Sequence, residues 1–154
     1  MVLNSDEKQN KFLMVGEKDI VPELMCPPQA FEGAENISKP TGGMWFTKSD
    51  SNVSYNSWLR FIATRDDLFY RKFDKNAVEV SVDPKAKILI PHSLDDMQFL
   101  SDKYHFTLPS SVRTNKLINY HLLSKEYDGI FMSKSIIQTY QHPKWDVESL
   151  VLFN

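Results

Sequence analysis

The stretch AVEVSVDPKAKILIPHSLDDMQFLSDKY, residues 77–104, predicts two strands followed by a helix. In its first part valines recur at every second position, with Glu79 and Ser81 between them, which is typical of a half-buried strand. The continuous apolar run AKILIP, residues 86–91, favours a central strand covered on both faces. Residues 93–104 complete the unit with the clearest helical pattern in the chain.

This helix has both a start signal and an apolar side. Ser93 is a suitable N-cap, and Asp95 and Asp96 fall in the first turn, where the helix dipole favours acidic side chains. We expect the apolar side to pack against the sheet, because a surface helix buries one stripe of side chains. Its expected members are Leu94, Met97, Phe99, Leu100 and Tyr104.

Outward from this unit, the same periodicities predict the rest of the domain. We expect further strands at 11–15, 43–47, 129–133 and 149–153, helices at 54–67 and 115–127 (Leu122 facing inward), and a short helix or edge segment at 135–143. Residues 16–42 are dense in Pro and Gly, which favours a long irregular connection. Hairpins mixed with helices predict an α+β fold: a mixed, mostly antiparallel sheet with about three helices.

Size and composition bound the class of protein. The chain has 154 residues, 42% of them hydrophobic, which fits a single compact domain over residues 11–154 after a flexible terminus at 1–10. A net charge of −2 disfavours a nucleic-acid partner, because it provides no basic surface for phosphates. The polar start, the single cysteine and the lack of an apolar run of about 20 residues predict a cytoplasmic protein without a membrane span.

Metal binding is not expected from this sequence. The four histidines do not show the spacing of a metal-binding motif, and one cysteine provides no thiolate pair. We therefore look for chemistry that needs only organic side chains.

The segment KPTGGMWFT, residues 39–47, is the first candidate for such chemistry. Gly42 and Gly43 would let a ligand or another backbone approach closely, and Lys39 could meet a phosphate. Trp45 offers a ring for stacking, and Thr47 presents a hydroxyl at the end of the expected strand. The segment fits the rim of a nucleotide cleft, although a simple turn entering a buried strand explains the same residues.

Two later segments supply further candidates. Glu148 stands directly before the apolar run that closes the chain, where a carboxylate can orient a ribose hydroxyl or stabilise an oxocarbenium-like centre. One alternative is an ordinary exposed acid at a strand end, and Asp146 competes with Glu148 for any such role. In YDGIF, residues 127–131, Asp-Gly is typical of a helix stop, and Tyr127 could line a pocket.

A long loop, then K-P-x-G-G-x-W-F-[ST], then a helix carrying a Trp resembles small bacterial and phage proteins of the ADP-ribosyltransferase-like type. The resemblance implies that Thr47 helps to hold the nicotinamide ribose of NAD and that Glu148 matches the acid on a late strand of the family. It also implies that Trp45 and Tyr127 wall the cleft and that Lys39 meets the pyrophosphate. NAD would be the substrate, with no metal involved.

The resemblance implies transfer of ADP-ribose to a macromolecular acceptor, in the host-cell cytoplasm if the protein is phage-encoded. It covers about a third of the chain and departs from the family pattern at the first strand. The family has an Arg or His there, near the adenosine, whereas Lys11 is the polar residue that this chain offers. A non-enzymatic phage or bacterial protein-binding module, which inhibits or recruits a partner protein, therefore stays open as the alternative.

Overall fold

The computed structural model describes residues 11–15, 40, 42–49, 77–105, 118–140, 145 and 147–153. The strands within them are β1 (Lys11–Val15), β2 (Met44–Lys48), β3 (Ala77–Ser81), β4 (Ile88–Leu89), β5 (Gly129–Met132) and β6 (Ser149–Leu152). The helices are α2 (Leu94–Lys103), α3 (Tyr120–Leu123) and α4 (Lys134–Tyr140). The expected flexible terminus at 1–10, the connection at 16–39 and the helix at 54–67 lie outside the described residues.

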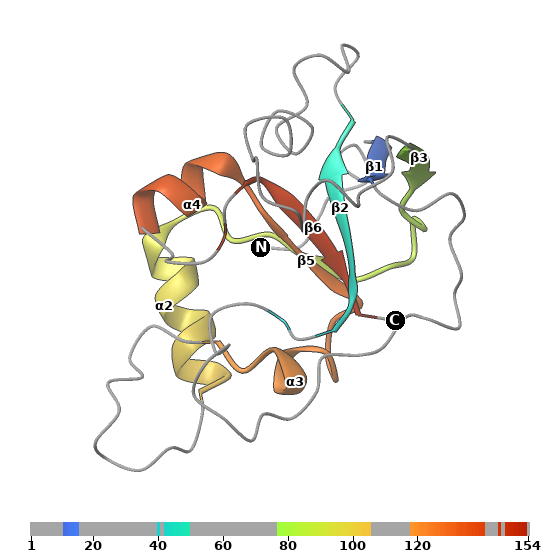
Figure 1. Ribbon diagram of the computed structural model, residues 1–154. Helices are drawn as coiled ribbons and strands as arrows, with labels where there is room; N and C mark the ends of the chain where they lie inside the picture. Colours follow the sequence, from blue (N-terminus) through green and yellow to red (C-terminus); the bar gives the residue numbers. More distant parts are fainter. Residues whose placement is uncertain are drawn as a thin grey trace, which may run out of the picture.

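The strands form one six-stranded sheet in the order β3-β1-β2-β6-β5-β4. Only the β4–β5 pairing is parallel among the described strands, and the other neighbouring pairs are antiparallel. A parallel pair needs a crossover connection, and here the chain passes through α2 and α3 between β4 and β5. The domain is therefore α+β, with the mixed, mostly antiparallel sheet that the sequence predicts (Figure 1).

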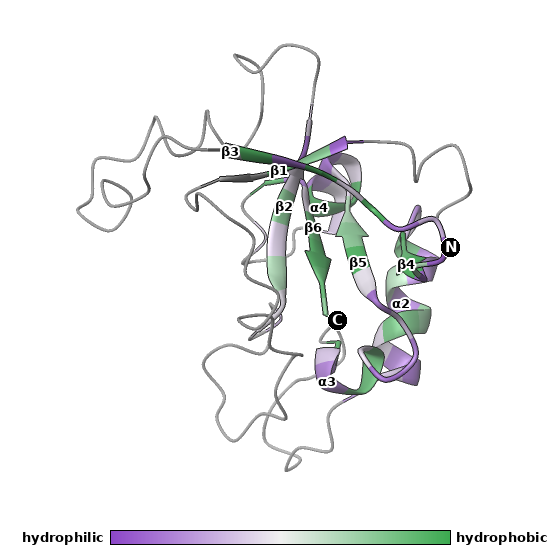
Figure 2. Cartoon of the chain, turned by 90° about the vertical axis from the view of Figure 1, so that its right-hand side faces the viewer, coloured by the Kyte–Doolittle hydropathy of each residue, from purple (hydrophilic) through white to green (hydrophobic). Residues whose placement is uncertain are grey.

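Apolar side chains pack on both faces of this sheet. The helix-side cluster joins residues of α2, α3 and α4 to the inward face of β5 and β6, and it includes Met97, Leu123, Ile136, Met132 and Val151. The helices lie together on that side of the sheet (Figure 1), and the central strand β6 is coloured mostly hydrophobic (Figure 2). The far-face cluster covers the opposite side and consists of Phe12, Phe46, Val82, Ile88, Ile90 and Leu150.

Among the described strands, the one expected to be central is instead short and lies at the edge of the sheet. β4 contains only Ile88 and Leu89, and β5 is its neighbour in the sheet. Both side chains are fully buried, one in each cluster. The apolar run thus reflects two covered faces, and this covering comes from the helices and the β3–β4 connection rather than from strands on either side.

α2 confirms its expected start but not its whole apolar side. The Ser93 hydroxyl accepts a hydrogen bond from the Asp96 backbone N–H at 3.1 Å. Met97, Leu100 and Tyr104 face the helix-side cluster. Leu94 and Phe99, which we expected to face inward, are 47% and 53% exposed. Phe99 is two residues from Met97, about 200° around the helix, and therefore points away from the sheet.

The helix expected at 115–127 is much shorter within the described residues. α3 begins after Asn119, whose side-chain oxygen accepts the Leu122 N–H at 3.2 Å. The Asn119 N–H donates to the Tyr104 carbonyl at 2.6 Å, so this residue is tied to the end of α2. Because Asn119 is the N-cap, Ile118 lies before the helix and not in it. Leu122, which we expected to face inward, is exposed.

Asp128 fixes the end of the sheet at which β5 begins. Its carboxylate accepts the Lys87 N–H at 2.7 Å, and its own N–H donates to the Lys87 carbonyl at 3.0 Å. Its carbonyl accepts the Phe153 N–H at 2.7 Å. One residue therefore joins the chain before β4 to the chain after β6, and this structural role accounts for the Asp-Gly pair.

Candidate functional site

Thr47 and Glu148 lie at the same end of two neighbouring strands. β2 and β6 are antiparallel, with Trp45 opposite Val151 and Phe46 opposite Leu150. In such a pair the end of one strand adjoins the start of the other. Thr47 is the next residue along β2 and is 3% exposed, and Glu148 directly precedes β6. Two residues that are about 100 positions apart in the sequence thus lie at one end of a single strand pair.

The Glu148 carboxylate is oriented by the start of α4. Its Oε2 atom accepts a hydrogen bond from the Lys134 backbone N–H at 3.2 Å. Lys134 begins α4, and the preceding strand places Met132 opposite Ser149, so the helix start and Glu148 are held by the same strand pair. A backbone N–H in the first turn of a helix favours a negative charge. Glu148 is half-buried, which leaves the carboxylate within reach of a ligand.

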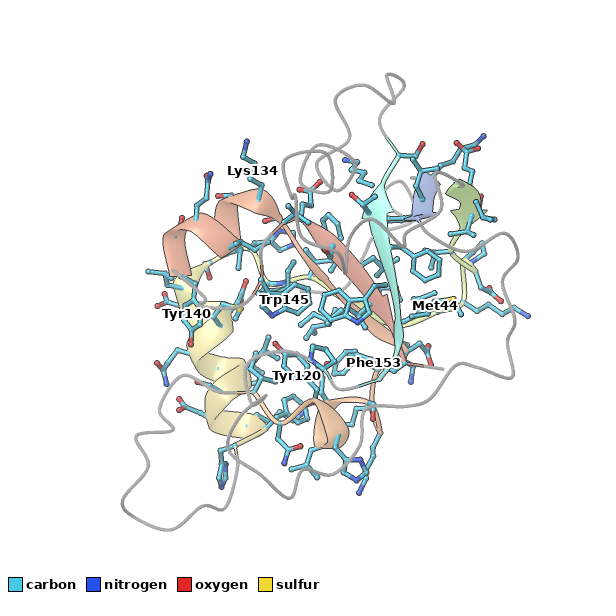
Figure 3. The ribbon with its side chains drawn as sticks, viewed as in Figure 1. Met44, Tyr120, Lys134, Tyr140, Trp145 and Phe153 are labelled. Carbon is cyan, nitrogen blue, oxygen red and sulfur yellow. The ribbon has the colours of Figure 1, made fainter. Side chains whose placement is uncertain are left out.

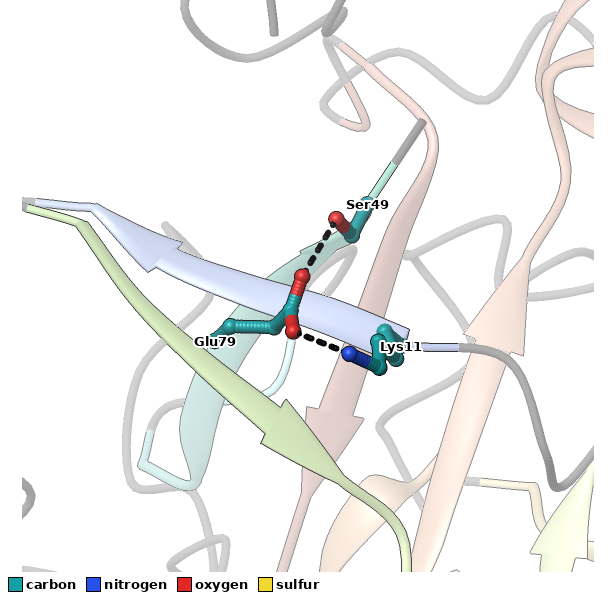
Figure 4. Close-up of polar contacts among 3 residues, drawn as sticks. All are labelled: Lys11, Ser49 and Glu79. Atoms are coloured by element: carbon teal, nitrogen blue, oxygen red, sulfur yellow. Dashed lines mark hydrogen bonds and ion pairs between the residues drawn. The ribbon is translucent and has the colours of Figure 1, made fainter. Parts of the chain in front are cut away.

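A second polar group occupies the same end of the sheet. The Lys11 Nζ atom contacts Glu79 Oε1 at 2.6 Å, and the Ser49 hydroxyl donates to Glu79 Oε2 at 3.2 Å (Figure 4). The Ser49 N–H also donates to the Lys11 carbonyl at 2.7 Å. The hydrogen bond from Lys11 lowers the pKa of Glu79, and the Ser49 bond adds to this. Glu79 is therefore ionised at neutral pH.

This polar group adjoins Thr47 because of the β1 register. Phe12 pairs with Lys48 and Leu13 pairs with Thr47, so Lys11, at the start of β1, lies beside the end of β2. Leu13 also pairs with Glu79 on its other side. We define the Thr47 end as Lys11, Thr47, Ser49, Glu79 and Glu148. They come from four adjacent strands or their ends.

Sequence reasoning missed two members of the Thr47 end, Ser49 and Glu79. Both have a signal in the strand period of two, because Ser49 is two residues after Thr47 and so shares its side of the strand. Glu79 faces away from the valines of β3, as its alternation predicts. The sequence does not reveal the strand order, in which β1 lies between β3, the strand of Glu79, and β2, the strand that Ser49 follows.

Other predicted site residues lie at the opposite end of the sheet. Gly43 enters β2 beside Leu152, and a Cβ atom there would meet the Leu152 carbonyl oxygen at 2.7 Å. Gly42 and Gly43 have φ of 111° and 78°, in the region that favours glycine. Tyr127 precedes β5, whose first residue also pairs with Leu152. The four steps from Gly43 to Thr47 separate the two ends by roughly 13 Å along the strand.

Trp45 lies between the two ends and faces the helices. Its ring centroid is 4.9 Å from that of Trp145, and Tyr120 packs against Trp145 at 6.4 Å. The helix-side cluster contains Trp145 and Tyr120 as buried members (Figure 3). Trp45 and Tyr127 are partly buried against it. Burial raises the pKa of Tyr120. This aromatic group supports the fold, and the half-exposed Trp45 is its member on β2.

Lys39, the residue expected to meet the pyrophosphate, lies outside the described residues. Within the described ranges no group of three or more His, Cys, Asp or Glu side chains is arranged to hold a metal ion. None of the helices described is long and apolar enough to cross a membrane. Comparison with family models, with curated proteins and with solved structures gives no match to this chain.

Proposed function

We propose that the chain binds NAD and transfers its ADP-ribose group to a macromolecular acceptor in the cytoplasm. One observation carries the proposal. Thr47 and Glu148, expected from the resemblance to act together, lie at one end of the paired strands β2 and β6. Two polar residues that act on one ribose must lie near each other, and this shared end of adjacent strands supports the proposal.

The proposed reaction breaks the bond between nicotinamide and ribose. Nicotinamide leaves with the bonding electron pair, and positive charge develops on the ribose carbon and ring oxygen. A fixed carboxylate near that centre lowers the barrier because it is already oriented for the developing charge. Glu148 takes this part, held by the Lys134 N–H. The acceptor then forms a bond to the ribose carbon and gives up a proton.

The remaining residues bind and orient the dinucleotide in this proposal. Thr47 positions the ribose or Glu148, while Trp45 and Tyr127 wall the cleft. Gly42 and Gly43 lie at the far end of β2, and an extended dinucleotide has two halves that can contact both ends. Lys39 and Lys11 are the cations proposed for its pyrophosphate. An acceptor protein fits the net charge of −2 better than a nucleic acid does.

The test is release of nicotinamide from NAD by the full chain, measured by chromatography with and without a lysate as the source of acceptors. We expect Glu148→Gln to lower the rate by a factor of about 100 to 1,000, the cost of losing one transition-state electrostatic contact. Thr47→Val should lower it less. Asp95→Asn, which removes an exposed carboxylate on α2, is the matched control and should keep the rate.

Absence of any NAD-induced rise in melting temperature at millimolar NAD, together with no nicotinamide release, would remove this proposal. The alternative is a protein-binding module, which the exposed Leu94 and Phe99 on α2 favour. Partner capture that survives Glu148→Ala but is lost in a Leu94→Ser, Phe99→Ser variant would identify that function instead.

A further inference from the structure

At the Thr47 end, Glu79 contacts the Lys11 amine, which an anionic ligand would need. The Lys11 ammonium contacts Glu79 Oε1 at 2.6 Å, and the Ser49 hydroxyl donates to Glu79 Oε2 at 3.2 Å. A cation and a hydroxyl donor that converge on two oxygens of one anion are also the partners that a phosphate group takes. Glu79 therefore engages both of these donors from within the chain (Figure 4).

We propose that Glu79 competes with the pyrophosphate of the dinucleotide for Lys11 and Ser49. The pyrophosphate must displace the Glu79 carboxylate from these two residues in order to bind. The proposal rests on the proposed function for the identity of the ligand. In this proposal Glu79 weakens binding of the dinucleotide, whereas the other members of the Thr47 end strengthen it. The chemical class of the competing ligand is a diphosphate.

Displacement is feasible because the ion pair is exposed. The Lys11 and Glu79 side chains keep 61% and 46% of their surface accessible. Exposed ion pairs contribute only about 0.2–1 kcal/mol, because water and salt screen the two charges. A diphosphate carries more negative charge than one carboxylate and offers more acceptor oxygens, so it competes effectively for the same two donors.

The location of Glu79 makes the competition local to the candidate site. Leu13 of β1 lies between Thr47 and Glu79 and pairs with both, and Ser49 directly follows β2, two residues after Thr47. A ligand held by Thr47 and Glu148 is therefore next to β1, the strand on which Lys11 lies. A purely structural ion pair between β1 and β3 is the other explanation, and it predicts no effect of Glu79 on anion affinity.

The experiment measures binding of inorganic pyrophosphate and, separately, of NAD to the full chain by titration calorimetry at low ionic strength. For Glu79→Gln we expect a Kd tighter by a factor of about 1.4 to 5 for both ligands, which is the exposed-pair energy converted to affinity. Lys11→Gln should weaken binding, and Glu79→Gln should have no effect in the Lys11→Gln background. Asp83→Asn, which removes the same charge just after β3, is the matched control for long-range repulsion.

Each outcome decides a different part. Unchanged pyrophosphate affinity in Glu79→Gln, an equal gain in Asp83→Asn, or no pyrophosphate binding by any variant overturns the competitor role. Pyrophosphate behaving as expected while NAD neither binds nor is cleaved removes the ADP-ribosyl function and leaves the competition standing. Glu79→Asp, which keeps the charge but shortens the side chain, provides a second variant and should bind with intermediate affinity.

Discussion

At the scale of single residues, β2 combines two kinds of requirement within one short segment. Its entry needs glycine, because Gly43 has a φ of 78° and lies against the Leu152 backbone. Its other end carries the hydroxyl of Thr47, which is buried beside the start of β6. The Gly-Gly pair in KPTGGMWFT is therefore explained by packing, and a ligand contact there would be additional to that role.

Gly43→Ala should destabilise the fold by more than the roughly 1–2 kcal/mol that a left-handed conformation costs an L-residue. The added Cβ also meets the Leu152 carbonyl oxygen at 2.7 Å, and backbone atoms cannot move aside cheaply. Urea unfolding should show a lower midpoint with an unchanged slope.

Gly129→Ala separates the two causes of that destabilisation. Its Cβ would meet the Val151 carbonyl oxygen at 2.5 Å, without a positive φ, so it should destabilise through the close contact alone. Thr139→Ala on the exposed side of α4 should stay within about 0.5 kcal/mol. A midpoint for Gly43→Ala equal to that of Thr139→Ala would contradict this account of the β2 entry.

At the scale of elements, α2 and α3 are joined at their ends by one carboxylate. The Lys103 ammonium contacts Glu126 Oε2 at 2.7 Å, and the Tyr104 hydroxyl donates to the same oxygen at 2.9 Å. The hydrogen bond from Lys103 lowers the pKa of Glu126, and the bond to Glu126 raises the pKa of Lys103. Burial raises the pKa of Tyr104.

The contribution of Glu126 to stability should depend on pH with a definite sign. Because its folded pKa lies below the ordinary value of 4.5, the stabilisation is present above that value and is lost as pH falls through the folded pKa. The Lys103 contribution is present below its ordinary pKa of 10.5 and is lost as pH rises through its raised folded pKa.

Urea unfolding of the wild-type protein and of Glu126→Gln, from pH 2 to pH 8, measures this. The difference in unfolding free energy should be constant above about pH 5 and should vanish toward the acid end. Asp95→Asn, which removes an exposed carboxylate on α2, is the matched control. A difference that persists unchanged at pH 2 would assign the Glu126 effect to packing rather than to its charge.

The elements also show what the sequence can predict and where it stops. The alternation in 77–83 and the cap at Ser93 are local signals, and β3 and the start of α2 follow them. The edge position of β4 and the exposure of Phe99 depend on which parts of the chain cover which face. Which face is covered depends on contacts between residues far apart in the sequence. Periodicity alone therefore predicted the position of β4 and the orientation of Phe99 wrongly.

The candidate site divides in the same way. Thr47 and Glu148 can be chosen as candidates from their residue types, whereas the pairing of β2 with β6, which sets them at one end of the sheet, depends on contacts distant in sequence. The separation of Tyr127 and the glycines from Thr47 follows from strand direction, which the sequence leaves open. Glu79 was not predicted as a site residue, because an acidic residue on the polar side of a strand is common and its neighbours in space are not known from the sequence.

At the scale of the whole molecule, the order of strands in space differs from their order along the chain. β6 lies between β2 and β5, so among the described strands it alone joins the set β3-β1-β2 to the pair β5-β4. A nascent chain emerging from the ribosome would have both sets before the piece that unites them. Until residues 149–152 arrive, each set has an open edge that can pair with another chain. The sheet is therefore completed only after residues 149–152 have left the ribosome, and chaperones that shield open strand edges should matter most before that point.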